Sequence, residues 1–175
     1  MTDRGDEVAL LETEPGTILC LLCDRRHTDL YRRWSKDNGR TWSKRESLRQ
    51  MLDCVLQRPV LTRLDAKTLL LSGRDFKRRL VVAYLSRDNG QSFGERHVLD
   101  SFQRDGAYTT AVVTGKGRVL MAWYSDQGTV ALKPDIKLAT LSVPERPRWL
   151  WISLPASRCW DRTTNFCARV GECRS

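Results

Sequence analysis

Apolar residues along this chain occur in short runs that are separated by turns rich in Gly, Asp, Asn and Pro. Residues 17–23 and 80–85 are typical, since each run is short and contains mainly Leu, Val, Ile, Ala, Tyr or Cys. Runs of this length and composition favour strands, because an amphipathic helix needs a longer stretch with a period of 3.6 residues. The pattern therefore predicts an all-β protein.

One segment of eight residues occurs twice, at 35–42 and at 86–93, with an offset of 51 residues. Both copies follow the pattern Ser-x-Asp-x-Gly-x-Thr/Ser-aromatic. The fixed residues are Ser35, Asp37, Gly39 and Trp42 in the first copy and Ser86, Asp88, Gly90 and Phe93 in the second. The hydroxyl and carboxylate suit loop N–H groups, glycine suits positive φ, and the ring suits the space between strands. We predict hairpin turns in which these eight residues are structural.

The same offset continues upstream of both segments. It aligns Leu10 with Leu61, Thr17 with Thr68, Leu19 with Leu70 and Asp24 with Asp75. A repeat of about 50 residues is typical of propeller blades and solenoid turns. We expect units at about 7–50, 57–100 and 107–142. Their expected strands are 7–11, 17–23, 30–34 and 43–48; 59–64, 68–74, 80–85 and 95–99; and 107–113, 118–124 and 135–141.

The two segments resemble the Asp-box repeats, also called BNR repeats, of sialidases (neuraminidases) and sialidase-like proteins. The resemblance covers about residues 7–142 and implies a six-bladed β-propeller with a box between the third and fourth strands of a blade. Six blades of about 50 residues need roughly 300 residues. This 175-residue chain is therefore expected to hold about three blades, the C-terminal half of such a propeller. It would be a fragment, an open array, or a half that pairs with another copy through its open blade edges.

Composition narrows the choice of ligand. The net charge of +9 is spread over strands and turns rather than gathered in one basic run. Without a nucleic-acid motif, nucleic acid is not the expected partner, and an acidic sugar fits the charge as well. Cys20 and Cys23 lie three residues apart in one expected strand and should point to opposite faces, so no metal site is expected there. We expect no cofactor.

Two terminal features complete the domain organisation. Residues 1–5 are polar and do not resemble a signal peptide, and no run of 18 apolar residues occurs, so the chain as written is expected to be cytoplasmic without a membrane segment. Residues 144–175 contain three of the six Trp and three of the six Cys but no trace of the repeat. We expect this tail to be poorly ordered, apart from 149–152 as a candidate last strand.

Strand direction predicts where chemistry would lie. Strands alternate in direction, so the start of each first strand and the end of each second strand share one rim, opposite the boxes. The residues expected on this rim are Glu7, Arg58 and Tyr108 at first strands and Cys23, Arg74 and Asp126 at second strands. His27 and His97 are expected on the surface.

The resemblance implies roles for some of these residues. Tyr108 looks like the family's nucleophile, Glu7 like the glutamate that activates it, and Arg74 like one of three arginines that bind the substrate carboxylate. A neutral phenol suits an anomeric centre that carries a carboxylate, because an anionic nucleophile would be repelled. Arg58, Arg25 and Asp126 are further candidates for substrate binding.

The chain also departs from the family pattern. Cys23 stands where the family commonly has an arginine, although Arg25 and Arg26 are close by, and the Arg-Ile-Pro segment and the acid/base aspartate are missing. The expected function is that of an exo-α-sialidase-like glycoside hydrolase with an incomplete catalytic set, so that this chain alone has little or no activity. The alternative is a non-catalytic Asp-box propeller that binds carbohydrate or protein.

Overall fold

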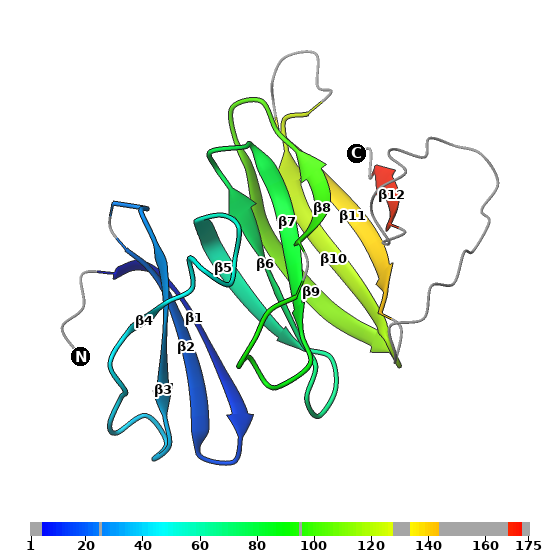
Figure 1. Cartoon of the computed structure of the whole chain (residues 1–175). Helices are drawn as coiled ribbons and strands as arrows, with labels where there is room; N and C mark the ends of the chain where they lie inside the picture. The colour runs from blue at the N-terminus through cyan, green and yellow to red at the C-terminus, as the bar shows by residue number, and fades with distance from the viewer. Residues whose placement is uncertain (1–4, 25, 95, 128–133, 144–167, 173–175) are drawn as a thin grey trace.

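The computed structural model describes residues 5–24, 26–94, 96–127, 134–143 and 168–172, and within these ranges every regular element is a strand (Figure 1). The first sheet consists of β1 (Gly5–Glu14), β2 (Thr17–Asp24), β3 (Leu30–Ser35) and β4 (Glu46–Ser47). The second consists of β5 (Leu56–Arg63), β6 (Leu69–Asp75), β7 (Leu80–Ser86) and β8 (Arg96–Ser101). The third consists of β9 (Gly106–Gly115), β10 (Arg118–Ser125), β11 (Asp135–Ser142) and β12 (Ala168–Glu172).

All three sheets are antiparallel, and their strands are ordered as along the chain. The all-β prediction is therefore confirmed. Figure 1 shows the sheets following one another from the first to the third. In the described part of the chain, no helix is long and apolar enough to cross a bilayer.

Two outer strands differ from the expected ones. The strand expected at 43–48 is reduced to β4, because side chains interrupt the backbone pairing at its start. Arg33 Nε donates to Ser43 O at 2.6 Å, and Trp34 N of β3 donates to Ser43 Oγ at 3.0 Å. The third sheet gains β12, which pairs with β11 from Lys137↔Glu172 to Leu141↔Ala168. This strand lies in the tail that was expected to be poorly ordered, whereas 149–152 lie outside the described residues.

The apolar faces of the sheets are buried against one another. One cluster lies between the first and second sheets and includes Leu19, Leu21, Leu71 and Tyr84. A second cluster lies between the second and third sheets and is built around Trp123, Met121, Ala83 and Leu99. The first strands also follow one another, since β1 contacts β5 and β5 contacts β9.

The first repeated segment forms a tightly hydrogen-bonded turn after β3. Ser35 Oγ donates to Asp37 Oδ1 at 2.8 Å and accepts from Gly39 N at 2.8 Å. Asp37 accepts from Thr41 N at 2.8 Å and from Thr41 Oγ1 at 2.6 Å. Asn38 and Gly39 have φ of 56° and 84°, in the left-handed region that glycine tolerates best. The structure thus gives these residues the turn contacts that the sequence predicted.

The second segment repeats the turn after β7. Ser86 Oγ donates to Asp88 Oδ1 and accepts from Gly90 N, both at 2.7 Å. Asp88 accepts from Ser92 N at 2.9 Å and from Ser92 Oγ at 2.5 Å. Phe93 is buried in the cluster between the first and second sheets, whereas Trp42 is half-buried and donates from Nε1 to Gly39 O at 3.0 Å.

We predict that Gly90→Ala destabilises the fold more than Gly39→Ala. Both positions have φ near +85°, which costs an L residue about 1–2 kcal/mol. A Cβ on Gly90 would meet Leu19 Cδ2 at 2.6 Å, whereas on Gly39 the nearest atom is Ile18 Cδ1 at 3.7 Å. Overpacking adds about 1–3 kcal/mol at Gly90 alone. Denaturant unfolding would measure the difference, and equal losses would contradict the close packing at Gly90.

Asp37 should make stability depend on acid pH. Hydrogen bonds from the Thr41 hydroxyl and N–H and from Ser35 lower the pKa of Asp37 from 3.8 to about 2. A lowered folded-state pKa means that its stabilisation is complete above about pH 4 and is lost as the pH falls toward 2. We expect the stability gap between the wild type and Asp37→Asn to close over this window. Unfolding curves at several pH values would show this, with exposed Asp135→Asn as the control.

Candidate functional site

The start of each first strand lies beside the end of its second strand. The pairs are Glu7↔Cys23 in the first sheet, Gln57↔Arg74 in the second and Ala107↔Tyr124 in the third. Each Asp box lies at the other end of its sheet, since Asn38 N donates to Gly16 O and Asn89 N donates to Lys67 O in the turns between first and second strands. The predicted rim residues thus lie at the ends opposite the boxes.

The backbone at this rim is irregular in all three sheets. Pairing shifts register between Gly5 and Glu7, between Gln57 and Val60, and between Ala122 and Tyr124. Left-handed backbone occurs at Arg58 (φ 54°), Ala107 (φ 90°) and Tyr108 (φ 48°). Such conformations are unfavourable for residues with a Cβ and occur preferentially at functional sites. Two of these three residues are sequence-predicted site residues.

Glycine at position 73 allows this geometry in the second sheet. A Cβ on Gly73 would lie 2.5 Å from Gln57 O and 3.0 Å from Arg58 O. The bulged start of β5 therefore packs directly onto the backbone of β6. This close contact between the backbones of β5 and β6 fixes the backbone position of Arg58.

Glu7, Arg58 and Tyr108 form one cluster. Arg58 N donates to Glu7 Oε2 at 2.6 Å, and Arg58 Nε lies 2.8 Å from Glu7 Oε1. The guanidinium also stacks over the Tyr108 ring, 4.3 Å from its centroid, and Tyr124 stacks on the same ring at 5.5 Å. Glu7 is buried, whereas Tyr108 is half exposed. Arg58 thus contacts both the predicted glutamate and the predicted tyrosine.

Arg74 is held in place by three contacts. Its Nη1 lies 2.9 Å from Asp105 Oδ1, its Nε donates to Gln57 Oε1 at 3.2 Å, and its guanidinium lies over the Phe76 ring at 5.0 Å. The side chain of Arg74 is only 11% exposed.

Asp105 also contacts Tyr124. Burial and a hydrogen bond to Asp105 raise the pKa of Tyr124 above its ordinary value, so the Tyr124 phenol stays protonated.

Asp126 follows β10 and caps the connection between β8 and β9. Its carboxylate accepts from Gln103 N at 2.6 Å, from Arg104 N at 2.7 Å and from Asp105 N at 3.3 Å. Burial opposes ionisation, but these hydrogen bonds lower the pKa of Asp126 below its ordinary value. Asp24 and Asp75, at the equivalent places 51 residues apart, also accept hydrogen bonds from their loops. These contacts indicate a loop-capping role rather than substrate binding for Asp126.

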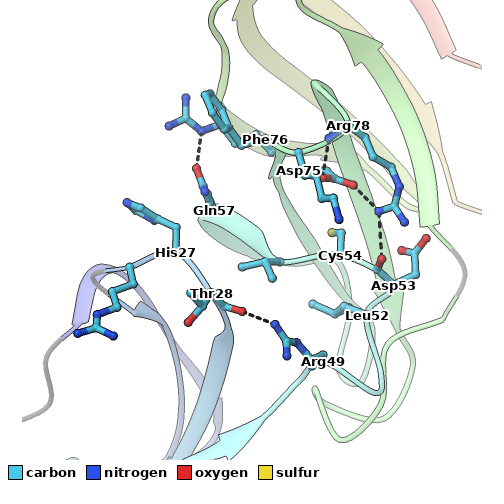
Figure 2. Close-up of a pocket in the computed structure, with 14 residues that line it drawn as sticks. His27, Thr28, Arg49, Leu52, Asp53, Cys54, Gln57, Asp75, Phe76 and Arg78 are labelled. Atoms are coloured by element: carbon cyan, nitrogen blue, oxygen red, sulfur yellow. Dashed lines mark hydrogen bonds and ion pairs between the residues drawn. The ribbon is translucent and has the colours of Figure 1, made fainter.

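A pocket of about 780 Å³ opens between the loops that follow β2 and β6 (Figure 2). Arg74 and Gln57 line it, and most of its charged residues are basic. Its lining cations are Arg26, Arg49, Arg74, Lys77 and Arg78, against the acids Asp53 and Asp75. Figure 2 shows Arg78 bonded to Asp75, and Arg49 bonded to the backbone of Thr28. Arg25 lies outside the described residues.

Asp53 and Cys54 line this pocket and were not singled out in the sequence, and both contact Tyr84 of β7. Tyr84 is buried and donates from its hydroxyl to Asp53 Oδ1 at 2.7 Å, and the Cys54 thiol lies 3.2 Å from the same hydroxyl. Burial raises the pKa of Cys54 to about 11, which argues against a nucleophilic thiolate. No sequence spacing predicted that Asp53 and Cys54 contact Tyr84, because these contacts form only when the linker before β5 lies across β7.

His27 and His97 were both expected on the surface, and both are half-buried. His27 Nδ1 lies 3.4 Å from Cys23 Sγ, and His97 lies in β8. His27 has φ of 52°, a left-handed conformation in which histidine is more common than most residues.

No protein-family model matches the chain, and no curated protein matches it.

We predict that Asp126→Ala destabilises the protein by about 2 kcal/mol, because three loop N–H groups lose a charged acceptor. Exposed Asp135→Ala should change the free energy of unfolding by less than about 0.5 kcal/mol. Denaturant unfolding of both variants would check this. Unchanged stability in Asp126→Ala would argue against the loop-capping role.

Proposed function

We propose that this chain forms about three blades of a sialidase-like Asp-box β-propeller and carries part of the site of an exo-α-sialidase-like glycoside hydrolase. Three meandering four-stranded sheets, with first strands in successive contact, support the propeller. Two hydrogen-bonded boxes at the same place in successive sheets support the Asp-box class.

The observation that carries the functional proposal is the gathering of Glu7, Arg58, Tyr108 and Arg74 at one rim. Arg58 contacts both Glu7 and Tyr108, and Arg74 lines the neighbouring basic pocket. Arginine suits a planar carboxylate because its guanidinium forms two parallel hydrogen bonds. A terminal sugar with a carboxylate is therefore the proposed ligand class.

In the proposed mechanism, Tyr108 Oη attacks the anomeric carbon while the glycosidic C–O bond breaks. A neutral phenol approaches without repulsion from the sugar carboxylate, and Glu7 accepts its proton. Arg58 is paired with the Glu7 carboxylate in this structure. Proton transfer to Glu7 therefore requires the Arg58 side chain to move toward the carboxylate of the bound sugar. Solvent water protonates the leaving oxygen, because no residue of this chain is assigned to that step. A second water then hydrolyses the glycosyl–Tyr108 bond, and Glu7 returns the proton to the phenol oxygen.

The second candidate is a non-catalytic propeller that binds the same acidic sugar. It is favoured by the position of Arg58, which neutralises Glu7 and covers the Tyr108 ring. The two candidates share a ligand but differ in turnover.

A binding measurement tests the proposed acidic-sugar ligand class. We expect the chain to bind free sialic acid in calorimetry, and Arg74→Ala to weaken binding at least roughly tenfold, because a charge-assisted contact contributes about 1.5–3 kcal/mol. Arg118→Ala, at the far end of β10, is the matched control and should bind as the wild type does. No binding by a folded chain, or equal loss in both variants, would contradict the acidic-sugar ligand.

Hydrolysis separates the two candidates. A fluorogenic sialoside would be incubated with the wild type and with Tyr108→Phe, which keeps the ring under Arg58. Turnover that is lost in Tyr108→Phe supports the glycosidase. Binding without turnover supports the non-catalytic propeller, and turnover that persists in Tyr108→Phe would exclude this residue as nucleophile.

A further inference from the structure

Three side chains of metal-ligand type meet at the rim of the first sheet. One carboxylate oxygen of Glu7, the sulfur of Cys23 and a ring nitrogen of His27 all lie within 4.8 Å of one another. Glu7 and Cys23 face each other across β1 and β2, and Cys23 Sγ lies 3.4 Å from His27 Nδ1. Cys23 and His27 are four residues apart, whereas Glu7 comes from the neighbouring strand β1.

The loop after β2 is built so that His27 returns to Cys23. Asp24 accepts from Thr28 N and Thr28 Oγ1, both at 2.6 Å, and from Asp29 N at 3.3 Å. His27 N donates to Asp24 O at 2.9 Å, and His27 adopts the left-handed φ of 52°. The hydrogen-bonded loop therefore holds the imidazole of His27 near Cys23.

The edge from Cys23 to His27 suits a tetrahedral ion. Zinc binds sulfur at about 2.3 Å and imidazole nitrogen at about 2.0–2.1 Å, so a tetrahedral S···N edge is about 3.5 Å. The Cys23 to His27 distance of 3.4 Å is close to this edge. Three protein ligands would leave one position open, as in zinc sites that hold a water or substrate.

Glu7 supplies an independent indication. Its side chain is only 7% exposed, and Oε1, although 2.8 Å from Arg58 Nε, has no aligned hydrogen-bond partner among the described residues. This oxygen is paired with the Arg58 guanidinium by charge alone, so a metal ion bound there would replace Arg58 as its cation. Arg58 N would keep its bond to the other oxygen.

We propose that Glu7, Cys23 and His27 form a three-ligand site for a thiophilic divalent transition metal, with Zn²⁺ as the expected ion. Thiolate and imidazole ligands favour Zn²⁺ over Mg²⁺ or Ca²⁺, which prefer oxygen. The thiolate and the carboxylate together neutralise the charge of the ion. The proposed ligand set joins Cys23 to Glu7 and His27, whereas the expectation of no metal site concerned Cys23 with Cys20.

The site goes beyond the proposed function and shares Glu7 with it, so an ion bound there would prevent Glu7 from accepting the proton of Tyr108. Cobalt(II) would serve as a spectroscopic probe for the reduced full chain, with no sugar present. We expect a thiolate-to-cobalt charge-transfer band and intense tetrahedral bands that saturate at one equivalent and disappear on addition of Zn²⁺. Sugar binding and hydrolysis would be measured separately, so failure of one proposal leaves the other standing.

Matched variants assign the ligands. Cys23→Ser should abolish the charge-transfer band, and His27→Ala should weaken cobalt binding roughly 100-fold, at least as much as loss of an outer-sphere partner. Cys20→Ser, a buried thiol in the same strand, and His97→Ala are the controls and should keep both band and affinity. The cysteines of residues 144–175 are present in every variant and so cannot produce a difference between them.

Thermal unfolding gives a second readout. Zn²⁺ should raise the Tm of the wild type and of Cys20→Ser, but not of Cys23→Ser or His27→Ala, because an ion that binds only the folded state stabilises it. Circular dichroism would establish that each variant is folded; if Cys23→Ser is not, His27→Ala decides. Absence of the cobalt band in the wild type, or its retention in folded Cys23→Ser or at full affinity in His27→Ala, would overturn the site.

Discussion

Burial of one sheet against the next is the constraint on which this structure depends. Each sheet has an apolar face, and among the described residues no helix is present to cover it. The two buried clusters therefore form between successive sheets. Close approach between sheets then becomes a requirement, which explains why Gly90 of the second sheet lies against Leu19 of the first.

The sequence predicted the elements that local chemistry determines. Both Asp-box turns form with the hydroxyl, carboxylate and glycine in the expected positions, because all their partners lie within seven residues. Long-range pairing was harder to predict. β12 depends on a partner strand about 30 residues away, and the shortening of β4 depends on Arg33 bonding Ser43 O.

The candidate site shows the same difference between features that the sequence predicted and features that depend on long-range contacts. Strand alternation predicted that Glu7, Arg58, Tyr108 and Arg74 share a rim, and the pairing registers bring them there. It did not predict that Arg58 contacts Glu7 and Tyr108 together, because this depends on left-handed backbone at Arg58 and Tyr108. Residue type favours such conformations for glycine, asparagine and histidine but not for arginine or tyrosine, so of these positions only His27 carried a signal in its residue type.

The second Asp-box turn has a consequence for how the chain folds. Gly90 packs on Leu19, and Arg32 donates to Gly90 O at 3.1 Å and to Gln91 O at 2.5 Å, so the first sheet completes a turn that belongs to the second. A repeat unit excised from its neighbour would leave that guanidinium or those carbonyl groups without their partners. Successive units are therefore energetically coupled, and the chain gains stability cooperatively as neighbouring units form rather than one unit at a time.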